Sequence, residues 1–414
     1  MTASIVIVHR PDDGAGSLPK RRGRGDALPA NARLLRTIVA ALPADFAPVS
    51  QLGVETALEA MAEATMLAIA ADLDCFLAWA RAERRPPLPA EPEDLVRYVR
   101  HLEAIGRKPS VASRRISSIA NLHRLVGLGE KDPLPTDHAM VRNALRAHRR
   151  RRGAAQRQAA PMRFGGALGD DTGFTISHLL EACDGDLQGL RDGALLSLAY
   201  DGGLRVSELN AARVDHLEPQ GDGSGLLFIP RSKTDQEAEG AWAWVSPDSM
   251  RRIQLWLVES GIEDGPLFRR VGVDRRRARA AIPPQPYHAI PGNTRHWRER
   301  LRGSPAIAAQ VTYTIGETPL TRQGVCGIYR RIALAAADAG LVGMFGEELE
   351  QAIAALSTHS LRVGLTQDLF AAGEDGAGIA LALRWASAAT ALRYGRKLAV
   401  RRNAASRVLS RIRS

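Results

Sequence analysis

The spacing of apolar residues predicts that the first half of the chain is helical. Between residues 53 and 149 apolar side chains recur every three to four positions, which is the period of a helix with one buried face. The clearest stripe consists of Ile69, Leu73, Phe76, Leu77 and Ala80. Further helices are expected at 92–104, 110–127 and 136–152, and no strand pattern interrupts them. This region therefore predicts a small four-helix domain.

From about residue 172 the pattern changes to helices mixed with two short β-rich runs. The runs are 225–230 and 240–247, and they flank a polar stretch, so they predict an antiparallel hairpin. Helices are expected at 175–184, 187–203, 247–260, 319–339, 347–356, 359–373, 376–384 and 387–396. The predicted fold is mainly α, with a helical N-terminal domain and an α+β domain that holds a small antiparallel sheet.

Three regions lack periodicity and set the predicted boundaries. Residues 1–48 are Gly- and Pro-rich with a basic cluster, and they predict a flexible basic tail. The helical domain then spans 49–152, a basic linker 153–171, and the second domain 172–414. Within the second domain residues 270–318 are basic and turn-rich. They are an insertion or long loop, for which extra DNA-contacting surface and disorder both remain open.

Charge adds the first indication of a partner. The 414 residues include 56 Lys and Arg against 45 Asp and Glu, a formal net charge of +11. A basic surface favours a polyanionic partner, most simply nucleic acid, although a generically basic protein has the same balance. Three widely spaced cysteines argue against a disulfide framework and fit a reducing cytoplasm. No run is long and apolar enough for a membrane helix, and the N-terminus does not have the pattern of a signal peptide.

Basic residues at the start of the predicted helix 110–127 are candidates for phosphate contacts. Lys108, Arg114 and Arg115 put positive charge near a helix N-terminus, against the helix dipole. An external anion would explain that placement, and ordinary solvated arginines are the alternative. We expect these three residues and Arg231 to contact DNA.

The segment 357-STHSLRVGL-365 carries the most specific candidate chemistry. His359 and Arg362 lie three positions apart at the start of a predicted helix, so they share one face of it. Taken alone, this pattern is more typical of a solvated surface pair. Its significance depends on other residues that could gather around the same point.

A second group of polar residues supplies such partners. Arg205 follows the turn at Gly202-Gly203, and Glu208 lies three residues later, where it can hold the guanidinium in place. Lys233 lies at the tip of the predicted hairpin. Trp385 and Tyr394 follow near the end of the chain. Each of these alone is more often structural, and only their joint order favours catalysis.

In this order the motifs GLRVSEL, SKTDQ and HSLRVG, followed by Trp385 and Tyr394, resemble the tyrosine recombinases, or phage integrases, and in particular their Cre-like branch. The resemblance covers roughly residues 50 to 414 without the insertion. Two features depart from the family pattern. Val363 stands where many members have His, and Arg384 stands before Trp385 where Gly is usual, which leaves the local turn in doubt.

The resemblance implies roles that agree with the chemistry of the side chains. Tyr394 would be the nucleophile, Arg205 and Arg362 would clamp the phosphate, and His359 would accept the tyrosine proton. Lys233 would be the general acid and Trp385 a donor to a phosphate oxygen, with Glu208 orienting Arg205 or His359. The resemblance implies a 3′-phosphotyrosyl intermediate, with neither metal nor ATP as cofactor.

The sequence therefore predicts a cytoplasmic, nucleoid-associated site-specific DNA recombinase that acts as a tetramer on double-stranded DNA carrying a specific target site. A type IB topoisomerase and a non-catalytic DNA-binding protein are the alternatives. An amphipathic stripe at 397–414 predicts a tail helix, which docks either on a neighbouring subunit or on its own domain.

Overall fold

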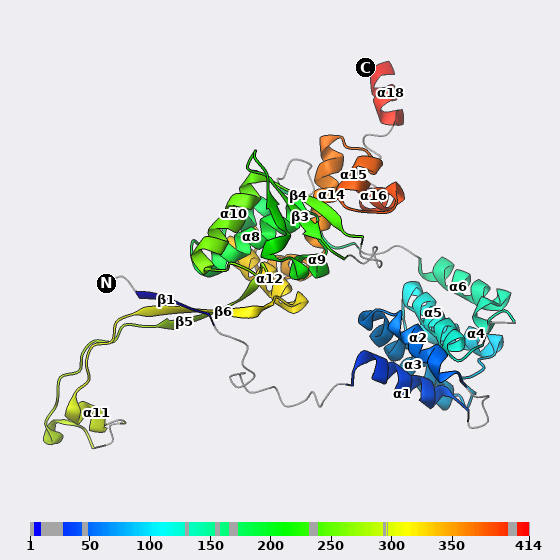
Figure 1. Ribbon diagram of the computed structural model, residues 1–414, viewed down its shortest axis with the longest axis horizontal. Helices are drawn as coiled ribbons and strands as arrows, with labels where there is room; N and C mark the ends of the chain where they lie inside the picture. Colours follow the sequence, from blue (N-terminus) through cyan, green and yellow to red (C-terminus); the bar gives the residue numbers. More distant parts are fainter. Residues whose placement is uncertain are drawn as a thin grey trace. The chain divides into compact units, whose positions relative to one another are not determined.

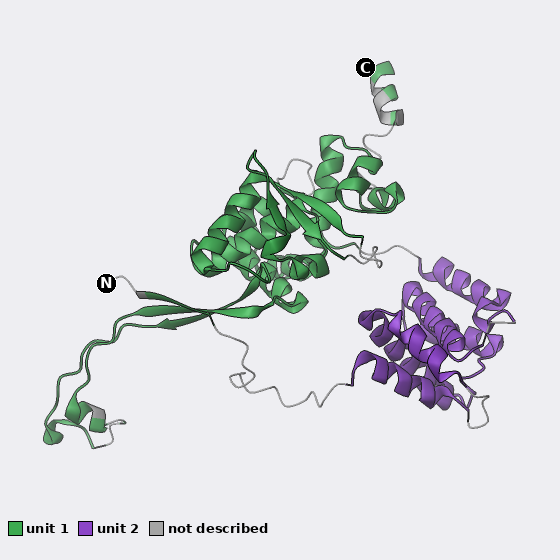
Figure 2. Ribbon diagram, viewed as in Figure 1, with its two compact units in different colours: residues 1–17, 158–414 green, residues 18–157 purple. Residues whose placement is uncertain are grey.

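The computed structural model describes residues 4–9, 28–43, 49–128, 132–153, 158–164, 173–231, 239–292, 295, 297–395 and 404–413. The chain forms two compact units (Figure 2). Residues 18–157 make up one, called here the helical unit, and residues 1–17 with 158–414 make up the other, called the mixed unit. Each unit has its own hydrophobic core. The described part of the chain contains no helix with both the length and the apolar character needed to cross a bilayer.

The helical unit contains six α-helices among its described residues (Figure 1). These are α1 (Ala30–Ala41), α2 (Gln51–Glu59), α3 (Glu63–Ala82), α4 (Pro92–Ala104), α5 (Pro109–Leu125) and α6 (Ala139–Arg152). The stripe on α3 is buried, and Phe76 meets Tyr98 of α4 edge to face at 5.1 Å between ring centroids. Such an aromatic pair adds about 1 kcal/mol beyond the area it buries. The apolar periodicity of these helices thus becomes a shared core.

The prediction that residues 1–48 form a flexible tail is wrong in part. α1 packs against α3 and buries Leu34, Ile38 and Ala41, which recur at helical spacing. Residues 4–9 form a strand, β1 (Ser4–His9), whose partner lies about 300 residues away in the chain, so no local pattern revealed it. The basic cluster at residues 20–24, predicted to be part of a flexible arm, lies outside the described residues.

The first half of the mixed unit is built around one central helix. Its elements are α7 (Ile176–Glu181), α8 (Leu187–Asp201), α9 (Val206–Ala211), β2 (Leu217–Pro219), β3 (Gly225–Ile229), β4 (Ala241–Val245) and α10 (Pro247–Ser260). α8 is buried on nearly all sides, as expected of a helix that is apolar all round. β2, β3 and β4 form an antiparallel sheet in that order. A mainly helical fold with a small antiparallel sheet is therefore confirmed.

The second half of the mixed unit is helical and ends in a separate small cluster. It contains α12 (Arg322–Asp338), α13 (Gly346–Ala355), α14 (Ser360–Ala372), α15 (Gly376–Ala382), α16 (Ala388–Tyr394) and α18 (Ala404–Ile412). Phe370, Ile379, Leu383 and Ala391 bring the end of α14, α15 and α16 together around their own apolar centre. This cluster fixes the two short helices on either side of Trp385.

The region 270–318 is not an irregular loop, which corrects that alternative, whereas the alternative of an insertion stays a prediction. β5 (Arg269–Arg276) and β6 (Gln310–Pro319) pair antiparallel at its two ends, with α11 (Trp297–Arg302) between them (Figure 1). β1 adds to the other edge of β6 in parallel, giving the order β1-β6-β5. The outer end of β5 is the polar run Asp274-Arg275-Arg276, so its sequence does not alternate between apolar and polar residues. Its extended form becomes visible only through its pairing with β6.

Part of the predicted linker 153–171 belongs to the mixed unit and packs against α14. Met162 is fully buried, and its N–H donates to the carbonyl of Ser360 at 3.0 Å. Gly364 faces this contact, and a Cβ there would lie 1.7 Å from the Met162 carbonyl oxygen. Arg163 Nε donates to Asp368 Oδ1 at 2.6 Å. Residues 158–164 therefore brace α14 rather than serve as a spacer.

Candidate active site

The turn between α8 and α9 presents Arg205 with its carboxylate already in place. Gly203 adopts φ +50°, and a Cβ there would come within 2.2 Å of Leu383, so only glycine allows this close approach. Arg205 is the N-cap of α9. Its backbone N–H donates to Glu208 Oε2 at 2.9 Å and its guanidinium to Oε1 at 2.6 Å. The i, i+3 spacing read from the sequence thus forms a bidentate clamp.

Glu208 is fully buried and serves several partners. Burial by itself raises the pKa of Glu208, but the hydrogen bonds from Arg205 and the charge of Arg384 outweigh it and hold that pKa below its ordinary value. The carboxylate is therefore ionised at neutral pH. One buried negative charge fixes the surrounding guanidinium groups.

Arg362 projects from α14 into the interior. Its side chain is 1% exposed, and it donates to the carbonyls of Gly203 and Leu383. Glu208 lies 4.0 Å away. Burial, and then the charge of Arg205, lower the pKa of Arg362 to about 9. The guanidinium is still charged at neutral pH but poorly compensated.

Arg384 joins the same carboxylate, and sequence reasoning did not assign it a role. It donates to Glu208 Oε2 at 3.3 Å and to the carbonyl of Gly202 at 2.9 Å, with 9% of its side chain exposed. Its φ is +53°, a left-handed conformation that costs a non-glycine residue about 1 kcal/mol or more. The one available signal was that an arginine stands where the family pattern has glycine.

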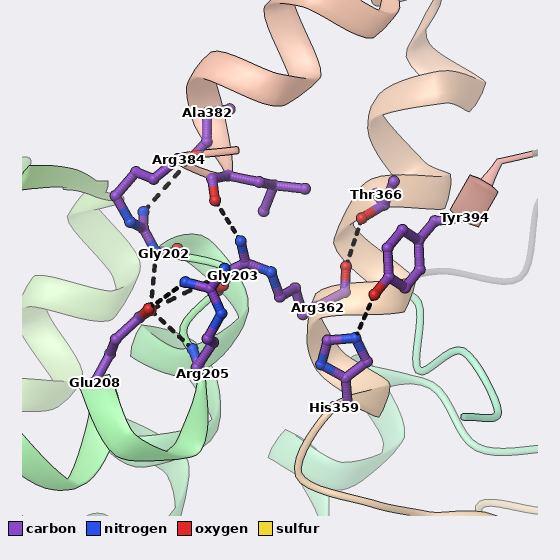
Figure 3. A network of polar contacts seen from close by, with 11 residues as sticks. Gly202, Gly203, Arg205, Glu208, His359, Arg362, Thr366, Ala382, Arg384 and Tyr394 are labelled. Atoms are coloured by element: carbon purple, nitrogen blue, oxygen red, sulfur yellow. Dashed lines mark hydrogen bonds and ion pairs between the residues drawn. The ribbon is translucent and has the colours of Figure 1, made fainter. Parts of the chain in front are cut away.

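The three guanidinium groups and the single carboxylate carry an excess of positive charge (Figure 3). Arg205, Arg362 and Arg384 against Glu208 leave two uncompensated positive charges. Each ion is largely removed from water, and a buried charge without a counter-ion costs folding free energy. An anion beside the cluster would relieve part of this cost, so the site is suited to bind a phosphate group.

His359 and Tyr394 meet on the opposite side of Arg362 (Figure 3). His359 Nε2 lies 2.9 Å from the Tyr394 hydroxyl. Burial, and then the charges of Arg362 and Arg205, lower the pKa of His359. The imidazole is therefore neutral near pH 7 and can accept the phenolic proton. Both residues belong to one chain, so a neighbouring subunit is not needed to form this pair.

Trp385 connects the pair to the arginines. Its ring stacks on Tyr394 with centroids 5.1 Å apart and planes inclined by 13°. The guanidinium of Arg362 lies 5.1 Å from the centre of the same ring. The indole thus holds the phenol close to the buried charge through stacking and a cation–π contact. Of the predicted catalytic and orienting residues, Arg205, Glu208, His359, Arg362, Trp385 and Tyr394 are brought together.

The structure describes the four residues predicted to contact DNA, whereas Lys233 lies outside the described residues. Arg231, at the end of the described segment before Lys233, is exposed. Lys108 is exposed at the N-cap of α5. Arg114 and Arg115 both face Asp72 of α3, at 2.9 and 3.6 Å. Arg115 is only 12% exposed and also contacts Tyr98, which leaves little of it for an external phosphate.

Comparisons with known proteins give a consistent picture. No protein-family model matches the chain. An integrase/recombinase xerD homolog from Selenomonas ruminantium is 32% identical over 216 residues, which cover 50% of this chain and 60% of that protein. Recombinase cre of Escherichia phage P1 is 30% identical over 201 residues, covering 47% of this chain and 56% of the relative. The matches thus span less than two thirds of the length of either relative.

The fold also resembles a solved recombinase structure. The XerH site-specific recombinase bound to palindromic difH substrate, in a post-cleavage complex, superposes with a TM-score of 0.51 over 90% of this chain and 92% of that one. At 11% identity this likeness concerns the fold alone. With the two sequence matches, it confirms that the chain resembles the tyrosine recombinases, as its motifs predict.

Proposed function

We propose that the chain is a site-specific DNA recombinase that cleaves and rejoins DNA through a 3′-phosphotyrosyl intermediate. The observation that carries this proposal is the meeting of Tyr394 with a neutral His359 beside a buried excess of arginine charge. A phenol needs a base to become a nucleophile, and a phosphodiester needs positive donors to stabilise its transition state. The site offers both within one chain.

In the proposed reaction Tyr394 Oη attacks the phosphorus while its proton passes to His359 Nε2. Arg205 and Arg362 stabilise the charge on the non-bridging oxygens, and the Trp385 N–H donates to one of them. The bond from phosphorus to the 5′ oxygen breaks, and Lys233 protonates that oxygen. A 5′-hydroxyl of another strand reverses these steps, so the phosphotyrosine keeps the bond energy and no nucleotide hydrolysis is needed.

The proposed partner is double-stranded DNA with a specific target site, bound by a tetramer in the cytoplasm at the nucleoid. The basic charge of +11 supports a polyanionic partner, and the relatives named above are an integrase/recombinase and a recombinase. A type IB topoisomerase would use the same phosphotyrosine chemistry. Strand exchange between two differently marked duplexes separates the two, because a relaxing enzyme rejoins only the original ends.

The test uses nicked duplexes with a randomised central sequence, on which cleavage releases a short strand and traps the enzyme. Covalent protein–DNA complexes that survive detergent are collected, and the bound DNA is sequenced to find the site. We expect wild-type protein to form the complex and Tyr394→Phe to form none. Tyr313→Phe is the matched control, because the Tyr313 hydroxyl bonds to Asp186 at the start of α8, the opposite end of that helix from the Gly202-Gly203 turn. A wild-type protein that forms no covalent complex on any sequence would favour a non-catalytic DNA-binding protein.

A further inference from the structure

The hairpin between β5 and β6 continues well beyond the two strands as a two-stranded ribbon. Isolated bridges join Arg279 with Ile307 and Ile282 with Ser304, each through two backbone hydrogen bonds of 2.9 Å. They keep the register of the strands, in which Val271 pairs with Ile315. At 3.3–3.4 Å per residue the ribbon from Val271 to Ile282 is about 37 Å long. Figure 1 shows it leading to the tip that carries α11.

This ribbon adds almost nothing to the hydrophobic core. Val271 is buried and Val273 packs against the core, but no described residue from Asp274 to Gln310 belongs to it. An isolated two-stranded ribbon is only marginally stable in water. Tyr287 at its tip is 72% exposed and Trp297 42%. A long ribbon that buries so little of itself presents its surface to a partner.

The charge of the ribbon indicates what kind of partner. Residues 274–310 contain eight arginines, one aspartate and one glutamate, so they hold +6 of the chain's net +11 in less than a tenth of its length. Arg275, Arg277 and Arg279 alternate along β5 and its extension, so they share one face about 7 Å apart. Arg275 has Asp186 at 3.2 Å, whereas Arg277 and Arg279 have no carboxylate partner among the described residues.

We propose that this ribbon is a second DNA-binding surface, which lies in the major groove of a duplex and pairs the arginines on this face of β5 with backbone phosphates. A major groove about 12 Å wide admits a two-stranded β-ribbon. The ribbon is about as long as one turn of the DNA helix, roughly 34 Å. A second copy of the chain is a poor occupant, because it too is basic. The inference rests on the proposed function only in taking DNA as the partner. It does not require that the protein cleaves DNA.

The test measures equilibrium binding of the full-length protein to a labelled mixed-sequence 40-bp duplex over a range of salt concentrations. The variant combines Arg275→Gln, Arg277→Gln and Arg279→Gln. Arg275 already has Asp186 as a partner, so only Arg277 and Arg279 are counted. If each of these two contacts one phosphate, the slope of log affinity against log salt becomes shallower by about 1.8. A second variant replaces residues 277–309 with Asn-Gly, a pair that closes two-residue hairpins, and keeps β5 and β6. It should show at least the same loss.

Two controls separate charge from disrupted structure. The matching triple lysine variant keeps the charge and should keep the slope. Arg97, Arg213 and Arg251 are exposed but each lies beside a carboxylate, at 2.8 Å or less. Their triple change to glutamine removes the same formal charge and should alter the slope by less than 1. An unchanged slope in both ribbon variants overturns the proposal. If the slope is unchanged but the variants no longer self-associate, the ribbon binds a second copy of the protein instead of DNA. Because cleavage is not needed, catalysis can fail while this result stands.

Discussion

The arginines around Glu208 and the arginines of the β5–β6 ribbon lie in opposite surroundings. Arg205, Arg362 and Arg384 are largely buried, and one carboxylate and four backbone carbonyls fix their positions. The ribbon arginines are exposed and mostly lack such partners. In the first group the planar, forked geometry of the guanidinium is used, whereas in the second only its charge is needed. Replacing arginine by lysine should therefore separate the two regions.

The largest effect is expected at the most buried arginine. Arg362→Lys keeps a positive charge but cannot donate to the carbonyls of Gly203 and Leu383 together while also facing a phosphate. We expect the single-turnover rate of covalent complex formation to fall by about 100-fold to 1,000-fold. Arg279→Lys on the ribbon is the matched control and should leave both rate and affinity unchanged. Equal rates for the two lysine variants would remove the distinction between the regions.

Removing the shared carboxylate should cost folding stability. Glu208→Gln leaves three buried guanidinium groups without a counter-ion, and we expect the free energy of unfolding to fall by about 3 kcal/mol at pH 7. Urea titration measures this, and Glu218→Gln, at an exposed position on β2, is the control.

The stability effect should depend on pH with a defined sign. Because the folded protein holds the pKa of Glu208 below its ordinary value of about 4.3, its contribution is fully present above that pH. It is lost as pH falls through the lowered pKa. The stability difference between wild type and Glu208→Gln should therefore shrink in acid, and a difference that grows there would contradict this account.

A smaller effect is expected at Arg384. Arg384→Gly relieves the left-handed backbone but removes the guanidinium that joins Glu208 to the turn before Trp385. We expect about a tenfold slower cleavage with unchanged DNA affinity, and Arg384→Lys should recover part of the rate. If the arginine only fills space, the glycine variant will be as active as wild type and more stable.

The smallest effect is a shift in pH dependence. The charges of Arg362 and Arg205 help to lower the pKa of His359, so the cleavage rate should stay flat until the pH drops below 6.5 and decline only there. Arg205→Gln should move that decline to higher pH, even though it also slows the reaction. Arg275→Gln on the ribbon should not move it. Rates measured from pH 5 to 8 check both, and a wild-type midpoint above 6.5 would contradict a neutral His359.

Local spacing made part of the site readable from the sequence. His359 with Arg362, and Arg205 with Glu208, are each three residues apart, and helix geometry brings such pairs together without tertiary information. The helical periodicity of α3 to α6 and the hairpin of β3 and β4 follow from local patterns in the same way. Trp385 and Tyr394 were identified through family resemblance rather than through geometry.

The sequence alone therefore determined the mainly helical fold and the residue types available for chemistry. The tertiary structure decided which of them meet: Arg384 reaches Glu208 across 176 residues, and β1 pairs with β6 across about 300. The physical reason is range. Periodicity and capping act over a few residues, whereas ion pairs, strand pairing and burial depend on which distant surfaces the packed core brings into contact.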